Sequence, residues 1–208
     1  MLSEFDSLLK TRVFQPKEKE IINLGLDRMH DAINALCLQE VSKKTIIVAG
    51  TNGKGAVTGA LWRLLSLSGC SVGLFSSPHL LKFQERIQCS NRQIGERELI
   101  NLFRKMQLRL ENSLFISLTY FEIATLLALM SFRLHKTEVN ILEVGLGGRL
   151  DAVNSVSPIF TALSSIGLDH RDILGNSIAQ IAKEKLGIVR KGGMFFCGNI
   201  DSKYRKDF

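Results

Sequence analysis

The segment Thr45–Ala56, TIIVAGTNGKGA, constrains the fold more than any other part of the chain. An apolar, β-branched run leads into a loop that carries three glycines around Lys54, and a helical pattern of apolar residues follows at once. Glycines allow backbone N–H groups to approach an anion without a Cβ in the way, and the N-terminus of a helix favours negative charge. The segment predicts a strand, a phosphate-binding loop and a helix, with Lys54 as a positive charge on the phosphates.

The loop departs from the usual phosphate-loop pattern at two places. Val48 stands at the first glycine position, and Gly55 and Ala56 follow the lysine where a hydroxyl side chain is expected. A tight glycine-rich turn with a surface lysine is therefore the alternative interpretation. The candidate ATP-binding residues are Gly50, Thr51, Asn52, Gly53, Lys54 and Gly55.

Strands and helices alternate after this segment. Near-continuous apolar runs are typical of buried parallel strands. We expect strands at Thr45–Ala49, Ser71–Phe75, Arg86–Cys89, Val139–Val144, Ile159–Leu163 and Met194–Cys197. We expect helices at Glu18–Leu38, Lys54–Leu67, Glu96–Leu110, Phe121–Leu134 and Asn176–Val189. This alternation predicts a three-layer α/β fold with a mostly parallel sheet.

Composition narrows the class of partner. The net charge is +7, with a pI near 9.4, but Lys and Arg are scattered and no basic stripe is interleaved with aromatic residues, so we expect no nucleic-acid partner. A small anionic substrate with a polyphosphate accounts for the excess. The four cysteines show no CxxC spacing, which argues against a zinc site or redox pair. The longest apolar run, Ile123–Phe132, is too short to cross a membrane, and we expect a cytoplasmic location.

Seven segments in a fixed order carry a resemblance to a known family. They are AGTNGKG, Ser76–Leu81 (SSPHLL), Phe83–Ile87 (FQERI), Leu118–Glu122 (LTYFE), Leu142–Asn154 (LEVGLGGRLDAVN), Ser165–Gly175 (SIGLDHRDILG) and Ile181–Val189 (IAKEKLGIV). Together they resemble the folylpolyglutamate synthase/dihydrofolate synthase family, a branch of the Mur-type ATP-dependent amide ligases. The resemblance runs from about Leu24 to about Val189 and implies a Mur-ligase-like central domain.

Members of this family are longer, because a C-terminal α/β domain follows the P-loop domain. We therefore expect residues 1–208 to form one incomplete P-loop ATP-binding ligase domain without a second domain. The polar segment Gly198–Phe208 does not resemble what the family has after IVRKGG, which favours the interruption of a longer reading frame.

One candidate metal ligand, Glu143, is suggested by its place in the chain. Glu143 ends a predicted parallel strand, where ligands collect and a carboxylate can hold Mg²⁺; an ordinary strand-end acid is the alternative. The resemblance favours the metal ligand. It also implies that Ser77 and His170 are metal ligands, and Ser77 would supply the hydroxyl that the loop lacks. Without it, a turn residue before Pro78 and a hydrogen-bonded structural histidine are the simpler interpretations.

Lys185 is distinctive on physical grounds alone. It lies on the apolar stripe of the predicted helix Asn176–Val189, one turn from Ile181 and Ala182. A buried lysine has a lowered pKa and exposes a neutral amine, which can react with CO₂. The resemblance implies that this lysine is carbamylated and binds a second Mg²⁺. A lysine whose amine reaches solvent is the alternative. The candidate catalytic residues are Lys54, Lys185 and His170.

The resemblance also implies a pterin site. Thr119 and Glu122 fit a capping box as well, and both roles are compatible. Arg86 is similar to an arginine near the folate-binding loop. The candidate substrate-binding residues are Thr119, Tyr120, Phe121, Glu122, Leu150, Asp151, Ala152 and Arg86.

The implied reaction uses ATP and two Mg²⁺ ions to add L-glutamate to dihydropteroate or to a folate polyglutamate through an acyl phosphate. Three interpretations are open. The chain is an active ligase, which a separate chain supplying the C-terminal domain could complete; it is a nucleotide- or folate-binding module without turnover; or it is an inactive fragment. A generic P-loop kinase or GTPase does not account for the SSPHL and GLDH segments.

Overall fold

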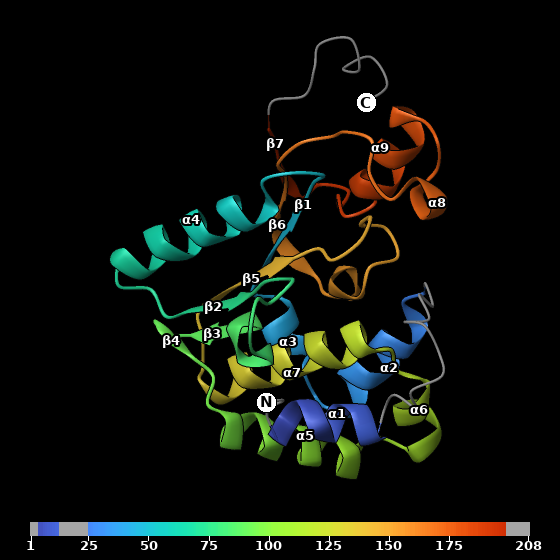
Figure 1. Ribbon diagram of the computed structural model, residues 1–208. Coiled ribbons are helices and arrows are strands. Elements are labelled where there is room, and N and C mark those ends of the chain that lie inside the picture. The colour runs from blue at the N-terminus through green and yellow to red at the C-terminus, as the bar shows by residue number, and fades with distance from the viewer. Residues whose placement is uncertain (1–3, 13–24, 199–208) are drawn as a thin grey trace.

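A seven-stranded sheet forms the centre of the fold (Figure 1). The computed structural model describes residues 4–12 and 25–198. The strands are β1 (Thr45–Ala49), β2 (Val72–Phe75), β3 (Ile87–Cys89), β4 (Arg92–Gln93), β5 (Val139–Glu143), β6 (Pro158–Leu163) and β7 (Met194–Cys197), in the order β4-β3-β2-β5-β1-β6-β7. β2, β5, β1, β6 and β7 are parallel, whereas β3 and β4 pair antiparallel at one edge. The predicted mostly parallel α/β sheet is confirmed.

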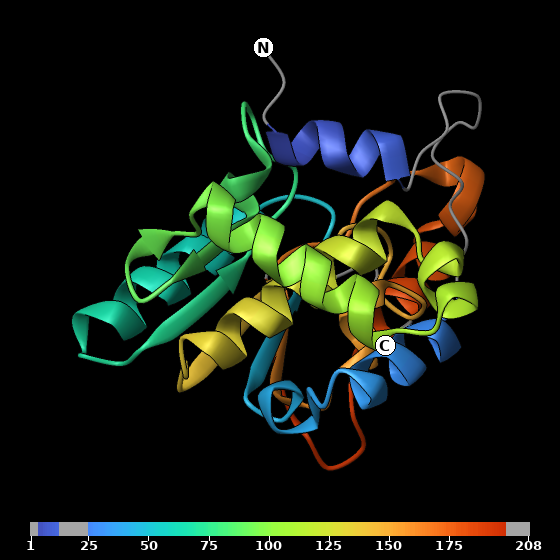
Figure 2. The same ribbon diagram turned by 90° about the horizontal axis from the view of Figure 1, so that it is seen from below.

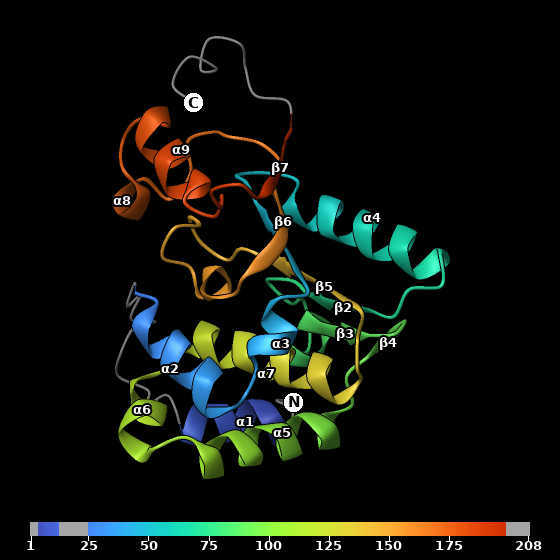
Figure 3. The same cartoon turned by 180° about the vertical axis from the view of Figure 1, so that it is seen from behind.

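Helices cover the two faces of the sheet unequally. The described helices are α1 (Glu4–Arg12), α2 (Asp27–Ala35), α3 (Gln39–Ser42), α4 (Lys54–Leu67), α5 (Glu96–Arg109), α6 (Asn112–Ser117), α7 (Tyr120–Leu134), α8 (Arg171–Leu174) and α9 (Ile178–Leu186), with 3₁₀ turns η1 (Phe83–Arg86) and η2 (Ala152–Ser155). Among the described helices, α4 alone covers one face, as Figure 3 shows from behind. On the other face α7 packs on the sheet, and α5 and α1 lie outside α7, so that α5 crosses in front of it in Figure 2, the view from below.

The register of the parallel strands places their carboxyl ends together. Val48 of β1 is opposite Glu143 of β5, and Ala49 is opposite Leu163 of β6. On the other side of β5, Phe75 of β2 is opposite Leu142. The loops that follow β1, β2, β5 and β6 therefore leave the sheet at one edge, which is where ligands bind in open parallel sheets.

The predicted elements after residue 45 are confirmed to within a few residues, and the differences lie in short helices. The predicted helix Glu18–Leu38 is shorter, because α2 begins at Asp27 and α3 follows as a separate turn; residues 18–24 lie outside the described residues. α1, α6 and α8 were not predicted, and two of these have only four to six residues. Across the described residues, no helix combines the length and the apolar character needed to cross a membrane.

Candidate functional site

The predicted phosphate loop joins β1 to α4, and two of its glycines are required by their backbone. Gly50 has a φ of +151°, and a Cβ there would collide with the hydroxyl group of Ser164. Gly53 has a φ of +80° at the N-terminus of α4, in the left-handed region that favours glycine. The loop therefore lies close to the segment that follows β6, and its backbone turns directly into the helix N-terminus.

Residues after β6 hold the loop in place. The hydroxyl of Thr51 donates to the carbonyl of Gly167 at 3.1 Å and accepts from the N–H of Gly167 at 3.0 Å. The N–H of Asn52 donates to the Ser165 hydroxyl at 2.9 Å, and the Ser164 hydroxyl donates to the Asn52 carbonyl at 2.7 Å. These contacts join the phosphate loop to the segment after β6, although the two lie more than a hundred residues apart in the sequence.

The two candidate lysines meet at a single backbone carbonyl. Lys54 Nζ donates to the carbonyl oxygen of Gly50 at 2.8 Å and to that of Thr51 at 3.2 Å. Lys185 Nζ reaches the same Gly50 oxygen at 3.1 Å from α9. The structure thus brings the loop lysine and the helix lysine together at the Gly50 carbonyl.

Lys185 is buried as predicted, with 2% of its surface exposed. Burial lowers the pKa of its amine to about 8, and the charge of Lys54 acts in the same direction. The carboxylates of Asp169 and Asp151 oppose this shift. With this pKa, about a tenth of the amine is neutral and nucleophilic at pH 7, far more than for an ordinary lysine.

Ser77 and Glu143 also lie together. The backbone N–H of Ser77, which precedes a cis Pro78, donates to Glu143 Oε2 at 3.2 Å. Burial raises the pKa of Glu143, whereas the Ser77 N–H and the charges of Lys54 and Arg86 lower it. A hydroxyl beside a carboxylate is a hard oxygen donor set that suits Mg²⁺ or Mn²⁺. No group of three or more His, Cys, Asp or Glu side chains gathers as a metal site in the described residues.

His170 is placed differently from the other candidate ligands. It precedes α8 with a φ of 44°, its side chain is 53% exposed, and its Nε2 lies 3.5 Å from Asp169 Oδ1. Within residues 4–12 and 25–198 it forms no hydrogen bond with Ser77, Glu143 or Lys185. The structure therefore brings Ser77 to Glu143 and the two lysines to Gly50, and it leaves His170 half-exposed beside Asp169, apart from both pairs.

The predicted capping box at the start of α7 is confirmed. The N–H of Thr119 donates to Glu122 Oε2 at 2.7 Å, and the N–H of Glu122 donates to the Thr119 hydroxyl at 3.3 Å. Arg28 of α2 pairs with the buried Glu122, with Nη2 3.0 Å from Oε1. The pair joins α2 to the first turn of α7, at the predicted substrate residues.

Aromatic rings surround Arg86 beside this turn. Its guanidinium carbon lies 5.6 Å from the ring centre of Tyr120 and 5.9 Å from that of Phe83, and its Nε donates to His79 Nδ1 at 2.7 Å. Phe121 packs against Phe75, with ring centres 5.6 Å apart. Arg86 is thereby fixed between the SSPHLL loop and the start of α7.

Asp151 organises the loop after β5. It is buried and accepts hydrogen bonds from the N–H groups of Gly145, Leu146 and Val153, at 2.8–3.0 Å. Burial raises its pKa to about 6, and these N–H groups oppose the shift. Leu150 is half-buried and Ala152 is buried. The glycines at 145, 147 and 148 lead into the 3₁₀ turn η2 and not into a long helix, so this loop lacks the strand–loop–helix context of a dinucleotide fingerprint.

We compared the sequence and the fold of this chain with those of known proteins. A scan against models of protein families finds no match. The dihydrofolate synthase/folylpolyglutamate synthase of Haemophilus influenzae is 42% identical over 190 residues, which are 91% of this chain and 41% of that protein. Escherichia coli FolC in complex with DHPP and ADP superposes with a TM-score of 0.82 at 37% identity, over 91% of this chain and 44% of FolC. The chain belongs to the dihydrofolate synthase/folylpolyglutamate synthase family.

A third comparison concerns a liganded member of this family. A bifunctional folylpolyglutamate synthase/dihydrofolate synthase with Mn, AMPPNP and L-glutamate bound is 42% identical, with a TM-score of 0.79, over 86% of this chain and 43% of that one. The chain spans about two fifths of the length of the curated relatives that it matches. The shared fold is thus that of one part of these synthases.

Several residues of this synthase-family site were missed by the sequence analysis. Ser164 and Ser165 brace the phosphate loop, Arg28 pairs with Glu122, and His79 fixes Arg86. Arg28 lies just after Leu24, where the resemblance begins, and His79 lies in SSPHLL. Ser165 is the first residue of the segment SIGLDHRDILG, so the positions of these three residues could have marked them. Nothing local reveals Ser164, because its partner Asn52 is distant in sequence.

Proposed function

We propose that the chain provides the nucleotide- and folate-binding part of an ATP-dependent ligase. The ligase adds L-glutamate to dihydropteroate or to a folate polyglutamate. The substrate carboxylate attacks the γ-phosphorus of ATP, ADP leaves, and the glutamate amine displaces phosphate from the acyl phosphate to form an amide. The observation that carries this proposal is the meeting of Lys54 and Lys185 at the Gly50 carbonyl, inside a loop shaped for a polyphosphate.

In this proposal the backbone of the loop and the N-terminus of α4 hold the phosphates, and Lys54 neutralises charge that develops on the transferred phosphoryl group. Lys54 now donates to two loop carbonyls and would exchange them for phosphate oxygens. The contacts of Asn52 with Ser164 and Ser165 keep the loop in shape during this exchange. The chain thus supplies a preorganised positive site.

Ser77 and Glu143 would hold one Mg²⁺ ion, and a carbamate on Lys185 a second one. When bound, Mg²⁺ neutralises charge on the β- and γ-phosphates. The carbamate would form when the neutral Lys185 amine attacks CO₂; a C–N bond forms, the nitrogen loses a proton, and one negative charge results. His170 would have to turn from solvent toward this second site.

At the substrate end, Tyr120, Phe121 and Arg86 would bind the pterin, and the turn Leu150–Ala152 would line it. The stacked Arg86 is held by His79 and by two aromatic rings, which favours a planar anionic partner. The capping box and the Arg28 pair would fix the start of α7 on the other side of the pterin.

A binding module without turnover is the second candidate. The chain matches 41% and 39% of the length of two relatives, and the rest of each relative lies outside the match. In this case a separate chain would supply the rest of the ligase. Positioning an amine against an acyl phosphate is an entropic task that needs both reacting groups held at once.

The deciding experiment measures ADP release from MgATP with and without dihydropteroate plus L-glutamate, alongside direct binding of AMPPNP. Release that depends on both substrates supports the ligase, and Lys54→Met abolishes it whereas the exposed-lysine control Lys183→Met does not. Binding of AMPPNP without release supports the module. Absence of both from folded protein contradicts the proposal.

Carbamylation has a readout that does not depend on activity. In ¹³CO₂-equilibrated buffer, wild-type protein should give a ¹³C carbamate signal that Lys185→Met removes and Lys183→Met retains. An unchanged signal in Lys185→Met would contradict the assignment.

A further inference from the structure

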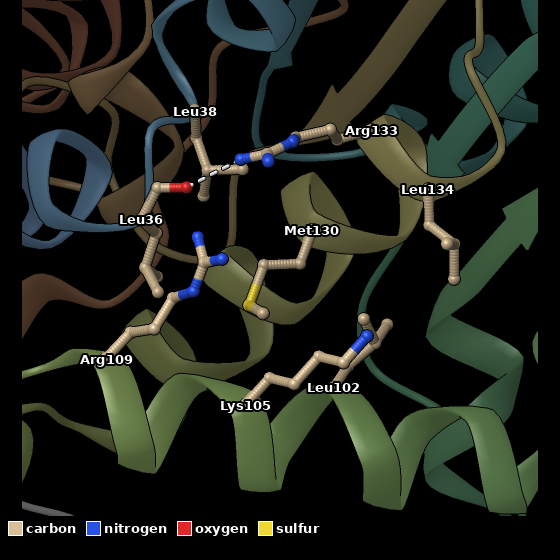
Figure 4. A pocket seen from close by; sticks show the side chains of 8 residues that line it. All are labelled: Leu36, Leu38, Leu102, Lys105, Arg109, Met130, Arg133 and Leu134. Atoms are coloured by element: carbon tan, nitrogen blue, oxygen red, sulfur yellow. Dashed lines mark hydrogen bonds between the residues drawn. The ribbon is translucent and has the colours of Figure 1, made fainter.

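A cavity of about 280 Å³ lies at the far end of α7 from the candidate site (Figure 4). It is formed by α5, α7 and the connection between α2 and α3. Met130, on its wall, is ten residues along α7 from Tyr120, which places it about 15 Å away along the helix axis. The cavity is therefore separate from the phosphate loop and from the predicted pterin residues.

The wall of this cavity combines apolar side chains with positive charge. Leu36, Leu102 and Met130 contribute apolar surface. Lys105 and Arg109 enter from successive turns of α5, and Arg133 enters from α7. Among the described residues that line the cavity, none is acidic. Lys105, Arg109 and Arg133 are exposed, so three cations stand at the mouth of a hollow whose floor is formed by buried leucines, with no counter-charge in its wall.

The cations retain donors for a ligand. Arg133 uses its Nη1 to donate to the carbonyls of Leu36 at 2.8 Å and Cys37 at 3.1 Å, which fixes its guanidinium at the end of α2. A guanidinium has five N–H donors, so this anchoring leaves others available. The side chains of Lys105 and Arg109 form no ion pair or hydrogen bond with any other residue of the described part of the chain. Figure 4 shows the Arg109 guanidinium pointing into the cavity toward Leu36.

We propose that this cavity binds a small amphipathic carboxylate, with its carboxylate at Arg109 and Lys105 and its apolar chain against Leu102 and Met130. Forked N–H donors match a carboxylate in two parallel hydrogen bonds. The flexible Met130 side chain adapts to an unbranched chain. A volume of about 280 Å³, just below the usual range for ligand pockets, fits a medium-length chain and is small for a nucleotide.

The test is calorimetric titration of the 208-residue chain with sodium hexanoate, octanoate and decanoate, with acetate and decanol as comparison ligands. We expect Kd to fall by about fourfold for each added CH₂ that the cavity buries. Acetate tests the charge without the chain, and decanol tests the chain without the charge; both should bind far more weakly than decanoate. Equal affinity for decanol would overturn the proposal, as would no binding of decanoate.

Matched variants locate the site. Arg109→Gln and Lys105→Gln should each weaken decanoate binding by about tenfold, because a charge-assisted hydrogen bond is lost. Arg104→Gln removes the same charge from an exposed position of α5 outside the cavity and should leave Kd unchanged. Met130→Trp should fill the cavity without altering charge and abolish binding, with the far-ultraviolet circular dichroism spectrum confirming the fold. Equal affinity in the Arg109 and Arg104 variants would overturn the proposal.

Discussion

The two faces of the sheet differ in how deeply they are covered. On the α7 face, Phe132 is 1% exposed and packs in a core that continues through α5 to α1. On the α4 face a single helix covers β2, β5 and β1, while Met194 and Phe196 of β7 are 70% and 60% exposed. Stability is therefore concentrated on the α7 face, whereas the phosphate loop leads into the first turn of α4, on the face that is less covered.

The largest expected contrast lies between side chains of the two faces. Phe132→Ala should lower the free energy of unfolding by about 3–5 kcal/mol, because it opens a cavity against Gly73 of β2. Leu67→Ala, at an exposed position of α4, should change it by no more than about 0.5 kcal/mol. Urea denaturation of both variants measures the contrast. Similar losses would show that the α4 face contributes equally to stability.

The buried Lys185 and the exposed Lys183 of α9 should differ in how they change stability with pH. The pKa of Lys185 is about 8 when folded and 10.5 ordinarily, so between these values the unfolded chain binds more protons and the free energy of unfolding rises with pH. In CO₂-free buffer the wild type should gain about 2 kcal/mol between pH 7 and pH 10 relative to Lys185→Met. Lys183→Met, at an exposed position of the same helix, should track the wild type. Parallel curves for wild type and Lys185→Met would contradict a lowered pKa.

Replacing either of two glycines on the α4 side with alanine should change the stability of the fold in opposite directions. Gly50→Ala must accommodate both a positive φ and a collision with Ser164, and should cost about 1–3 kcal/mol together with most AMPPNP affinity. Gly59→Ala lies inside α4 with open space around it and should stabilise the fold by about 0.5–1 kcal/mol. Thermal denaturation and AMPPNP titration report both. Loss of AMPPNP binding in Gly59→Ala would show that nucleotide binding depends on the body of α4 and not only on the loop before it.

The smallest expected effect separates two ion pairs. Arg28→Gln leaves the carboxylate of Glu122, only 4% exposed, without its partner, and should cost about 2 kcal/mol. Arg149→Gln breaks a pair whose arginine is 48% exposed and should cost less than about 1 kcal/mol. Urea denaturation at two salt concentrations distinguishes them, since only the exposed pair should be sensitive to salt.

The sequence predicts the parallel strands well because they are short apolar runs, and it predicts the burial of Lys185 because one polar residue interrupts an apolar stripe. Short helices such as α6 and α8 escape prediction, because their few residues carry too little periodicity. The site is predicted where a motif is local, as in Gly50 and Lys54. The serines that brace the loop depend on pairing between β1 and β6, which no local pattern records.

The edge of β7 has a practical consequence for handling the protein. In the described residues β7 pairs with β6 on one side only, so its other side presents a row of backbone donors and acceptors beside Met194 and Phe196. Such an edge is a template for another strand. Concentrated solutions of the chain should therefore lose material to edge-to-edge association at temperatures where the core is still intact, and a charged residue in place of Phe196 should extend their shelf life.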